Sequence, residues 1–377
     1  MTLTASLPPS LVRTLPGRDY TDPAVFEREL ECIFGKQWNA VARASDLPRP
    51  GSFVTAQVAR ESVIVVRGRD GALRAFLNVC RHRGARLCAE PSGEVKRSIR
   101  CGYHAWTYGL DGALVAAPNL VSMPDVDRTE FGLRQVHLRE WLGYVWLNLA
   151  DNPPPFDEAV VSQCTDRLGD PAAIERYGAT NLVVGRRIEY DVRANWKLII
   201  ENFVECYHCA TIHPELTGVL PEFAKGFAVQ YYVGHGAQFG ERVEGFTVDG
   251  SGGFDRLPTI GEEQDRRYYA ITVRPQVFIN LVPDHVIFHR MTPLAPDRTL
   301  VTCDWLYTEQ VVESGADLDK SVELFHRVNE QDFDACESCQ STAGSRAYAD
   351  GGVLVPSEHH IAEFHDWVRG QLTGAKA

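Results

Sequence analysis

The spacing of hydrophobic residues divides the chain into a helical start, a strand-rich stretch and a mixed remainder. Residues 22–38 carry apolar side chains at helical spacing behind a Thr-Asp-Pro start signal, which predicts an outer helix. From residue 39 to about 149, short alternating runs such as SVIVVRG and YVWLNL are separated by Asp-Gly turns, which predicts a small β domain. The Asn-Pro-Pro-Pro segment at 152–155 cannot continue a strand or helix and marks a linker.

Beyond this linker, strands and helices occur in separate runs. The predicted elements are a strand over 181–192, a helix over 196–212, strands between 227 and 307, and helices over 318–340 and 358–372. Such separation favours an α+β domain over a doubly wound one. We therefore predict an N-terminal arm and helix over 1–38 that pack on the third region, a β domain over 39–150 and an α+β domain over 151–377.

Charge and composition exclude some partners. The 377 residues include 38 Lys and Arg against 50 Asp and Glu, a net charge of −12 that argues against nucleic acid or anionic membranes. No apolar run approaches the roughly 20 residues of a membrane span, and the N-terminus lacks a secretory pattern. We expect a cytoplasmic protein whose ten cysteines bind metal or are buried, and do not form disulfides.

Two Cys-His pairs lie in the predicted β domain. Cys80 and His82 form the first pair, and after 18 intervening residues Cys101 and His104 form the second. Two thiolates and two imidazoles can hold a structural zinc, or a [2Fe–2S] cluster in which two histidines bind one iron. Each loop contributes one Cys and one His, which suits a cluster held from two sides. Zinc and simple core packing remain alternatives.

A second constellation lies in the predicted helix over 196–212. Glu205 falls on the line that its apolar residues form, so we expect its carboxylate to be directed at the core and to need a partner. His208 lies on nearly the same face, whereas His213 would sit about 140° further around a regular helix. If both histidines bind one metal, the helix must end, bulge or break before Pro214.

Two histidines leave a ferrous ion one protein ligand short, and a carboxylate would complete a facial triad with open positions. The helix predicted over 318–340 offers four acids: Glu330, Asp332, Asp334 and Glu337. Asp332 shares a face with Phe325 and Cys336, whereas Glu330 and Asp334 each point about 200° away from it. We therefore choose Asp332, with a core aspartate bonded to an N–H as the alternative.

Both constellations resemble Rieske oxygenase α subunits. The segment CRHRGARLC followed by CGYHAWTYGLDG is similar to their cluster-binding loops, although Gly102 stands where many relatives carry Pro. Residues 195–213 and the Asp…Gln motif before Gly344 are similar to their catalytic domain. The resemblance, over about residues 20–345, implies a small all-β Rieske domain and a catalytic domain with an antiparallel sheet flanked by helices. It implies a [2Fe–2S] cluster on Cys80, His82, Cys101 and His104, and O₂-activating Fe(II) on His208, His213 and Asp332.

Glu205 departs from the usual family pattern. Most relatives have Asp three residues before the first histidine, where it bridges to a cluster histidine of the neighbouring subunit. Glutamate resembles the branch that acts on carnitine, betaine and choline. The resemblance thus implies a homotrimer in which Glu205 links His208 to a neighbour's His104, and an oxygenase that hydroxylates or N-demethylates a small quaternary ammonium compound. An aromatic acid substrate, and an electron carrier or sensor without oxygenase activity, are the alternatives.

Electrons must come from a partner. The chain has neither a GxGxxG motif nor a plant-type cluster motif, so we expect a separate NAD(P)H-dependent reductase. We interpret the Cys206/Cys209 and Cys336/Cys339 pairs as helix-packing thiols. Aromatic side chains could bind an ammonium head through cation–π attraction. Candidates for this role are Tyr207, Tyr231, Tyr232, Phe239, Phe278, Phe288, Trp305 and Tyr307.

Overall fold

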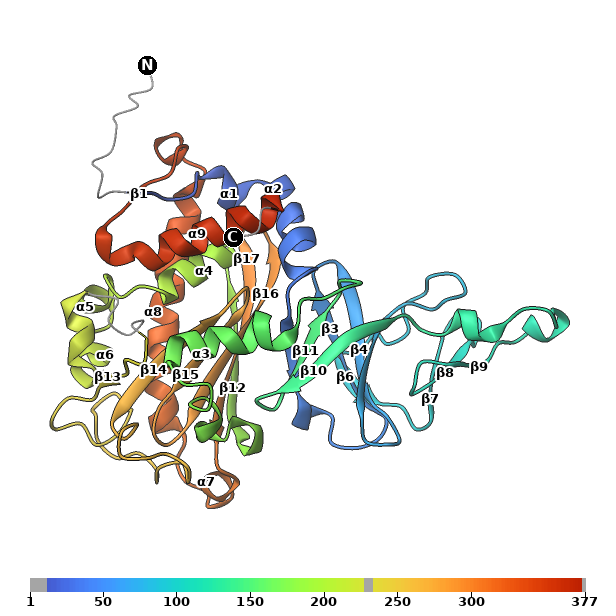
Figure 1. Cartoon of the computed structure of the whole chain (residues 1–377), viewed down its shortest axis with the longest axis horizontal. Helices are drawn as coiled ribbons and strands as arrows, with labels where there is room; N and C mark the ends of the chain where they lie inside the picture. The colour runs from blue at the N-terminus through green and yellow to red at the C-terminus, as the bar shows by residue number, and fades with distance from the viewer. Residues whose placement is uncertain (1–11, 227–232, 375–377) are drawn as a thin grey trace. The chain divides into compact units, whose positions relative to one another are not determined.

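The structure is a computed structural model that describes residues 12–226 and 233–374 (Figure 1). The chain divides into two compact units. One unit spans residues 34–159, and the other combines the residues up to Ile33 with those from Val160 onward. The first unit therefore ends nine residues after the end of our predicted β domain. The N-terminal helix belongs to the same unit as the α+β region. Among the described residues, no helix has the length and apolar character that a membrane crossing requires.

The first unit is all β, as predicted. A seven-stranded antiparallel sheet has the order β2-β11-β10-β5-β4-β3-β6, and a three-stranded sheet has the order β7-β8-β9. The strands are β2 (Asn39–Arg43), β3 (Ser52–Val58), β4 (Glu61–Arg67), β5 (Leu73–Leu77), β6 (Ser92–Glu94), β7 (Ser98–Arg100), β8 (Thr107–Gly109), β9 (Leu114–Ala116), β10 (Gln135–Trp141) and β11 (Tyr144–Asn148). In β4, Val63 and Val65 enter one buried cluster and Ile64 and Val66 another, which explains its continuous apolar run.

The second unit contains an antiparallel sheet with the order β12-β17-β16-β15-β14-β13. Its strands are β12 (Val183–Val192), β13 (Ala237–Gln238), β14 (Arg267–Val273), β15 (Val277–Leu281), β16 (Val286–Ala295) and β17 (Arg298–Tyr307). The helices of the unit are α1 (Arg18–Thr21), α2 (Pro23–Glu29), α3 (Ser162–Leu168), α4 (Trp196–Phe203), α5 (Cys209–Ile212), α6 (Pro214–Val219), α7 (Glu309–Glu313), α8 (Asp319–Ala343) and α9 (His359–Thr373). The short strands β1 (Val12–Arg13) and β18 (Val353–Leu354) also pair.

The antiparallel sheet flanked by helices confirms the predicted α+β class. Helices α4 and α8 contact each other, α4 also contacts β16, and α8 also contacts β12. A buried ion pair between Lys197 Nζ and Glu29 Oε1, 2.5 Å long, joins α2 to α4. The strands predicted from residue 227 begin, within the described residues, at β13, because residues 227–232 lie outside them.

Two helix predictions were too long. The helix expected over 22–38 is α2, which begins after the capping carboxylate of Asp22 and continues as a π-helical turn over Leu30–Phe34. The helix expected over 196–212 ends at Phe203 and resumes as α5. Between them, the Glu205 carboxylate accepts the Tyr207 N–H, a local contact that competes with helical hydrogen bonding. The inference that Glu205 lies on one continuous apolar helix line was therefore wrong.

Candidate active site

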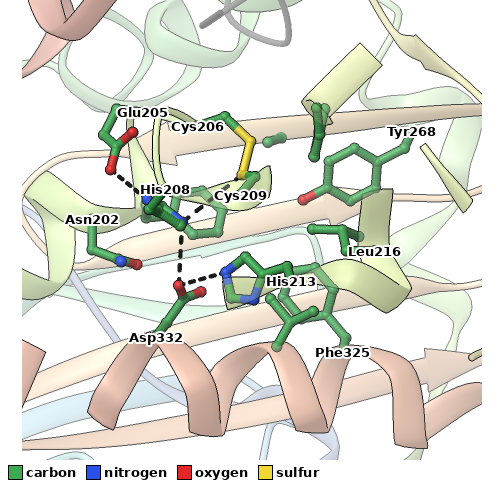
Figure 2. A pocket seen from close by; sticks show the side chains of 14 residues that line it. Asn202, Glu205, Cys206, His208, Cys209, His213, Leu216, Tyr268, Phe325 and Asp332 are labelled. Carbon is green, nitrogen blue, oxygen red and sulfur yellow. Dashed lines mark hydrogen bonds and ion pairs between the residues drawn. A yellow bond between two sulfur atoms is a disulfide. The ribbon is translucent and has the colours of Figure 1, made fainter. Parts of the chain in front are cut away.

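The structure brings His208, His213 and Asp332 together (Figure 2). His208 precedes α5, His213 follows it, and Asp332 projects from the middle of α8. Asp332 Oδ1 lies 2.8 Å from His213 Nε2 and 3.4 Å from His208 Nε2. One potential ligand atom from each residue lies within 4.8 Å of the others. The helix break between Phe203 and Cys209 allows two histidines five residues apart to face one carboxylate.

Outer contacts orient both imidazoles. Glu205 Oε1 contacts His208 Nδ1, and Gln331 Oε1 lies 2.7 Å from His213 Nδ1. Because both partners are acceptors, they keep a proton on each Nδ1, so that each Nε2 could bind a metal once it releases the proton that it shares with Asp332. Two neutral imidazoles and one carboxylate with such outer contacts form the donor set that holds ferrous iron in a facial triad. The residues present therefore fit a mononuclear iron. We did not predict this role of Gln331 from the sequence.

Without a metal ion, the three groups hold one another by charge. Burial opposes protonation of His208, but the carboxylates of Asp332 and Glu205 outweigh it and raise the His208 pKa to about 10. Burial also acts to raise the pKa of Asp332, yet the two histidines hold that pKa well below its usual range. In the metal-free site, a bound proton therefore supplies part of the positive charge that a metal ion would supply.

The three residues line a pocket whose empty volume, open solvent included, is about 360 Å³. Its other lining residues are Asn202, Phe203, Glu205, Cys206, Cys209, Leu216, Phe223, Tyr268, Ala270, Phe325 and Val328. None of the six described aromatics that we expected there is among them. Phe239, Phe278, Phe288, Trp305 and Tyr307 are buried in the core and Tyr207 is exposed, while Tyr231 and Tyr232 lie outside the described residues.

Cys206 and Cys209, which also line the pocket, form a disulfide across the turn that carries His208 (Figure 2). The expectations that this pair consists of packing thiols and that the cysteines form no disulfides were wrong here. In a continuous helix, two cysteines three residues apart lie one turn apart on the same face. The helix break after Phe203 changes the positions of Cys206 and Cys209 relative to each other. Cys336 is a buried free thiol on α8, as expected, and Cys339 is a free but exposed one.

The two Cys-His loops of the first unit also lie close together. Cys80 and Cys101 are buried, and the ring centroids of His82 and His104 lie 4.6 Å apart. Burial acts to raise the Cys101 pKa, but backbone N–H groups of Tyr103 and His104 and the nearby Cys80 lower it. Among the described residues, the buried His104 Nδ1 has no hydrogen-bond partner. Paired sulfurs and paired imidazoles, one of them with a free nitrogen, fit a [2Fe–2S] cluster.

Tyr108 completes the surroundings of the cluster loops and was missed from the sequence. Its buried hydroxyl accepts the Arg81 N–H at 2.9 Å and lies 3.3 Å from Cys80 Sγ. A hydroxyl so close to a ligand sulfur tunes the potential of a cluster. Tyr108 lies within the segment CGYHAWTYGLDG, but the segment does not show which residue its hydroxyl contacts, since the contact joins the first loop to β8.

Fold and sites together define an iron–sulfur protein with a second, mononuclear metal site. The family model of the "Rieske [2Fe-2S] domain" matches residues 37–129. The family model of the "Ring hydroxylating alpha subunit (catalytic domain)" matches residues 179–374. The chain therefore belongs to the Rieske non-haem iron oxygenases, which carry a [2Fe–2S] cluster and a mononuclear iron and use O₂. This membership decides for the cluster over zinc and for an enzyme over a simple electron carrier.

Similar proteins share nearly the whole chain. The glycine betaine monooxygenase oxygenase subunit of Pseudomonas aeruginosa is 32% identical over 94% of this chain and 88% of its own. The carnitine monooxygenase oxygenase subunit of Acinetobacter pittii is 31% identical over 96% and 95%. The quaternary ammonium Rieske monooxygenase CntA with L-carnitine superposes with a TM-score of 0.73 at 27% identity, over 97% of this chain and 99% of that one.

Proposed function

We propose that this oxygenase oxidises a small quaternary ammonium compound at a carbon next to nitrogen. The observation that carries this proposal is the lining of the pocket, which combines aromatic rings with acids. Phe203, Phe223, Tyr268 and Phe325 supply rings, Glu205 and Asp332 supply carboxylates, and no Lys or Arg occurs among the described lining residues. Aromatic faces attract a desolvated ammonium by about 2 kcal/mol.

The same lining disfavours the alternative aromatic acid. Benzoate is an anion without a positive charge of its own, and the described lining residues include no Lys or Arg that could pair with its carboxylate. A betaine carries a quaternary ammonium head that the aromatic rings of the lining can attract, whereas a benzoate has no cationic group for these rings. The relatives named for glycine betaine and carnitine oxidation support the same substrate class.

The proposed reaction consumes O₂, two electrons and two protons. One oxygen atom converts a C–H bond next to nitrogen to C–OH, and the other leaves as water. The resulting carbinolamine then breaks its C–N bond and releases an aldehyde, a tertiary amine and a proton. The electrons come from NAD(P)H through a separate reductase. The relatives' designation as oxygenase subunits and the absence of a GxGxxG motif support such a partner.

In this proposal His208, His213 and Asp332 hold the iron, which supplies O₂ activation when bound. Cys80, His82, Cys101 and His104 hold the cluster. The protein's own task is orientation: Glu205 and Gln331 fix the imidazoles so that both Nε2 atoms face the metal position. In a homotrimer, Glu205 would connect His208 to the partner subunit's His104.

The test is reductase-coupled O₂ uptake with glycine betaine, carnitine, choline and benzoate, with product quantified against O₂. We expect coupled turnover with at least one of the three ammonium compounds. Tyr268→Leu removes a ring of the pocket and should raise KM for that substrate roughly 10-fold, whereas the matched control Tyr268→Phe keeps the ring and should raise it far less. Coupled turnover with benzoate alone would overturn the substrate assignment.

A further inference from the structure

A second cavity lies beside the iron-site pocket in the same unit. Its empty volume, which includes open solvent, is about 930 Å³, and residues of α3, α4, α9 and β14 contribute to its walls. Tyr268 and Ala270 line the iron-site pocket, whereas Thr272, the next position on the same face of β14, and Arg274, in the turn after the strand, line the second cavity. The second cavity is thus a neighbour of the first, and the described residues that line one do not line the other.

Arg274 is a largely buried cation in this wall. Its Nε donates to Gln163 Oε1 at 3.4 Å, and its guanidinium carbon lies 5.4 Å from the centre of the Trp367 ring. Within residues 12–226 and 233–374, no carboxylate lies at ion-pair distance from this guanidinium. Burial lowers the Arg274 pKa, and Glu363 opposes the shift only from a distance. A buried charge with only a neutral amide and a ring as partners is costly, so the site favours an anionic ligand.

Two further features support an anion here. Thr272 lines the same cavity, and its buried hydroxyl has no hydrogen-bond partner among the described residues, which leaves a donor unused. Arg167 adds positive charge to the lining while its guanidinium donates to the carbonyl oxygens of Ala270 and His235. The acids of the lining, Asp166 and Glu363, are both exposed to solvent, so the cationic groups lie deeper than the acidic ones.

We propose that this cavity is a second binding site, specific for small organic carboxylates, with Arg274 as the counter-ion. The site takes a carboxylate whatever the substrate of the iron-site pocket is. The inference therefore goes beyond the proposed function and does not depend on it.

The experiment is equilibrium dialysis of the full-length, iron- and cluster-loaded protein with ¹⁴C-acetate. A ligand of four heavy atoms with one charge pair is expected to saturate one site in the millimolar range. Arg274→Gln should weaken acetate binding at least 10-fold. The matched control Arg298→Gln, which removes an exposed arginine paired with Asp191, should leave acetate binding unchanged.

Two results would overturn the proposal. One is the absence of saturable acetate binding to the unaltered protein at about 10 mM. The other is equal binding by the Arg274→Gln protein, which would place the acetate elsewhere, for example on the iron. If Arg274→Gln does not fold, Arg274→Lys keeps the charge but loses the planar fork, and should bind acetate at least threefold more weakly. Unchanged affinity in that variant would equally refute the assignment.

Discussion

Replacing Gln331 tests whether the outer contact of His213 sets the affinity for iron. Gln331 Oε1 accepts from His213 Nδ1 at 2.7 Å. The variant Gln331→Leu keeps a side chain of similar size and a good helix former on α8 but removes the acceptor. His213 would then lose the contact that fixes its tautomer and ring orientation while all three ligands remain.

The expected magnitude follows from burial. Loss of an outer partner of a metal-bound histidine lowers metal affinity about 10- to 100-fold, or roughly 1.4 to 2.7 kcal/mol. His213 is only 1% exposed, so water cannot readily replace the lost acceptor. We therefore expect an effect near the upper end of this range for Fe(II).

The assay is an anaerobic titration of Fe(II) against a competing colorimetric chelator. The visible absorption of the cluster, whose ligands lie in the other unit, serves as the control for folding. Asp334→Asn is the matched control, because Asp334 is an exposed acid on the same helix two residues beyond Asp332. The reasoning is refuted if Gln331→Leu binds Fe(II) as tightly as the unaltered protein, or if Asp334→Asn weakens binding to the same extent.

Three further predictions concern single side chains. Asp332→Ala should abolish turnover but leave the visible spectrum of the cluster unchanged, and retained turnover would contradict its assignment as an iron ligand. Thr272→Val removes a buried hydroxyl that has no partner among the described residues, and should raise the free energy of unfolding by about 1 kcal/mol in the absence of carboxylates; a lower urea midpoint would contradict this. Burial lowers the His289 pKa to about 4, so the unfolded chain takes up a proton below pH 6.5 that the folded protein rejects. The free energy of unfolding should therefore fall by about 3 kcal/mol as the pH drops from 6.5 to 4. Urea titrations should show a smaller fall for His289→Gln, and an equal fall in that variant would contradict this reasoning.

Residue spacing predicted the elements of the fold well where one strong signal dominates. The short alternating runs of the first unit became strands, and the periodic segments near the C-terminus became α8 and α9 with ends within three residues of those expected. The three candidate iron ligands were also brought together, even though the helix carrying two of them was predicted too long. The chemical requirement, two imidazoles and one acid around one ion, limited the third ligand to an acid, and helix periodicity then selected Asp332 from the four acids of its helix.

The pocket aromatics could not be predicted, because alternation separates two faces of a strand without showing which one faces a cavity. Every residue of β15 is buried, so Phe278 on that strand was as plausible a pocket residue as any of its neighbours. Phe278 instead stacks on Phe203, with ring centroids 3.8 Å apart, and it is Phe203 that lines the pocket. Gln331 and Tyr108 were missed for a related reason, since their roles arise from contacts between elements distant in sequence.

The segment over 204–208 shows why helix periodicity failed beside the metal site. Its residues continue a helical pattern, yet the Glu205 carboxylate contacts both the Tyr207 N–H and His208 Nδ1. A regular helix would place His213 about 140° away from His208 and keep it from Asp332. The contacts of Glu205, together with the convergence of the histidines on Asp332, offset the hydrogen bonds lost at the break. The local rule is therefore broken where the chemistry requires a geometry that a helix cannot provide.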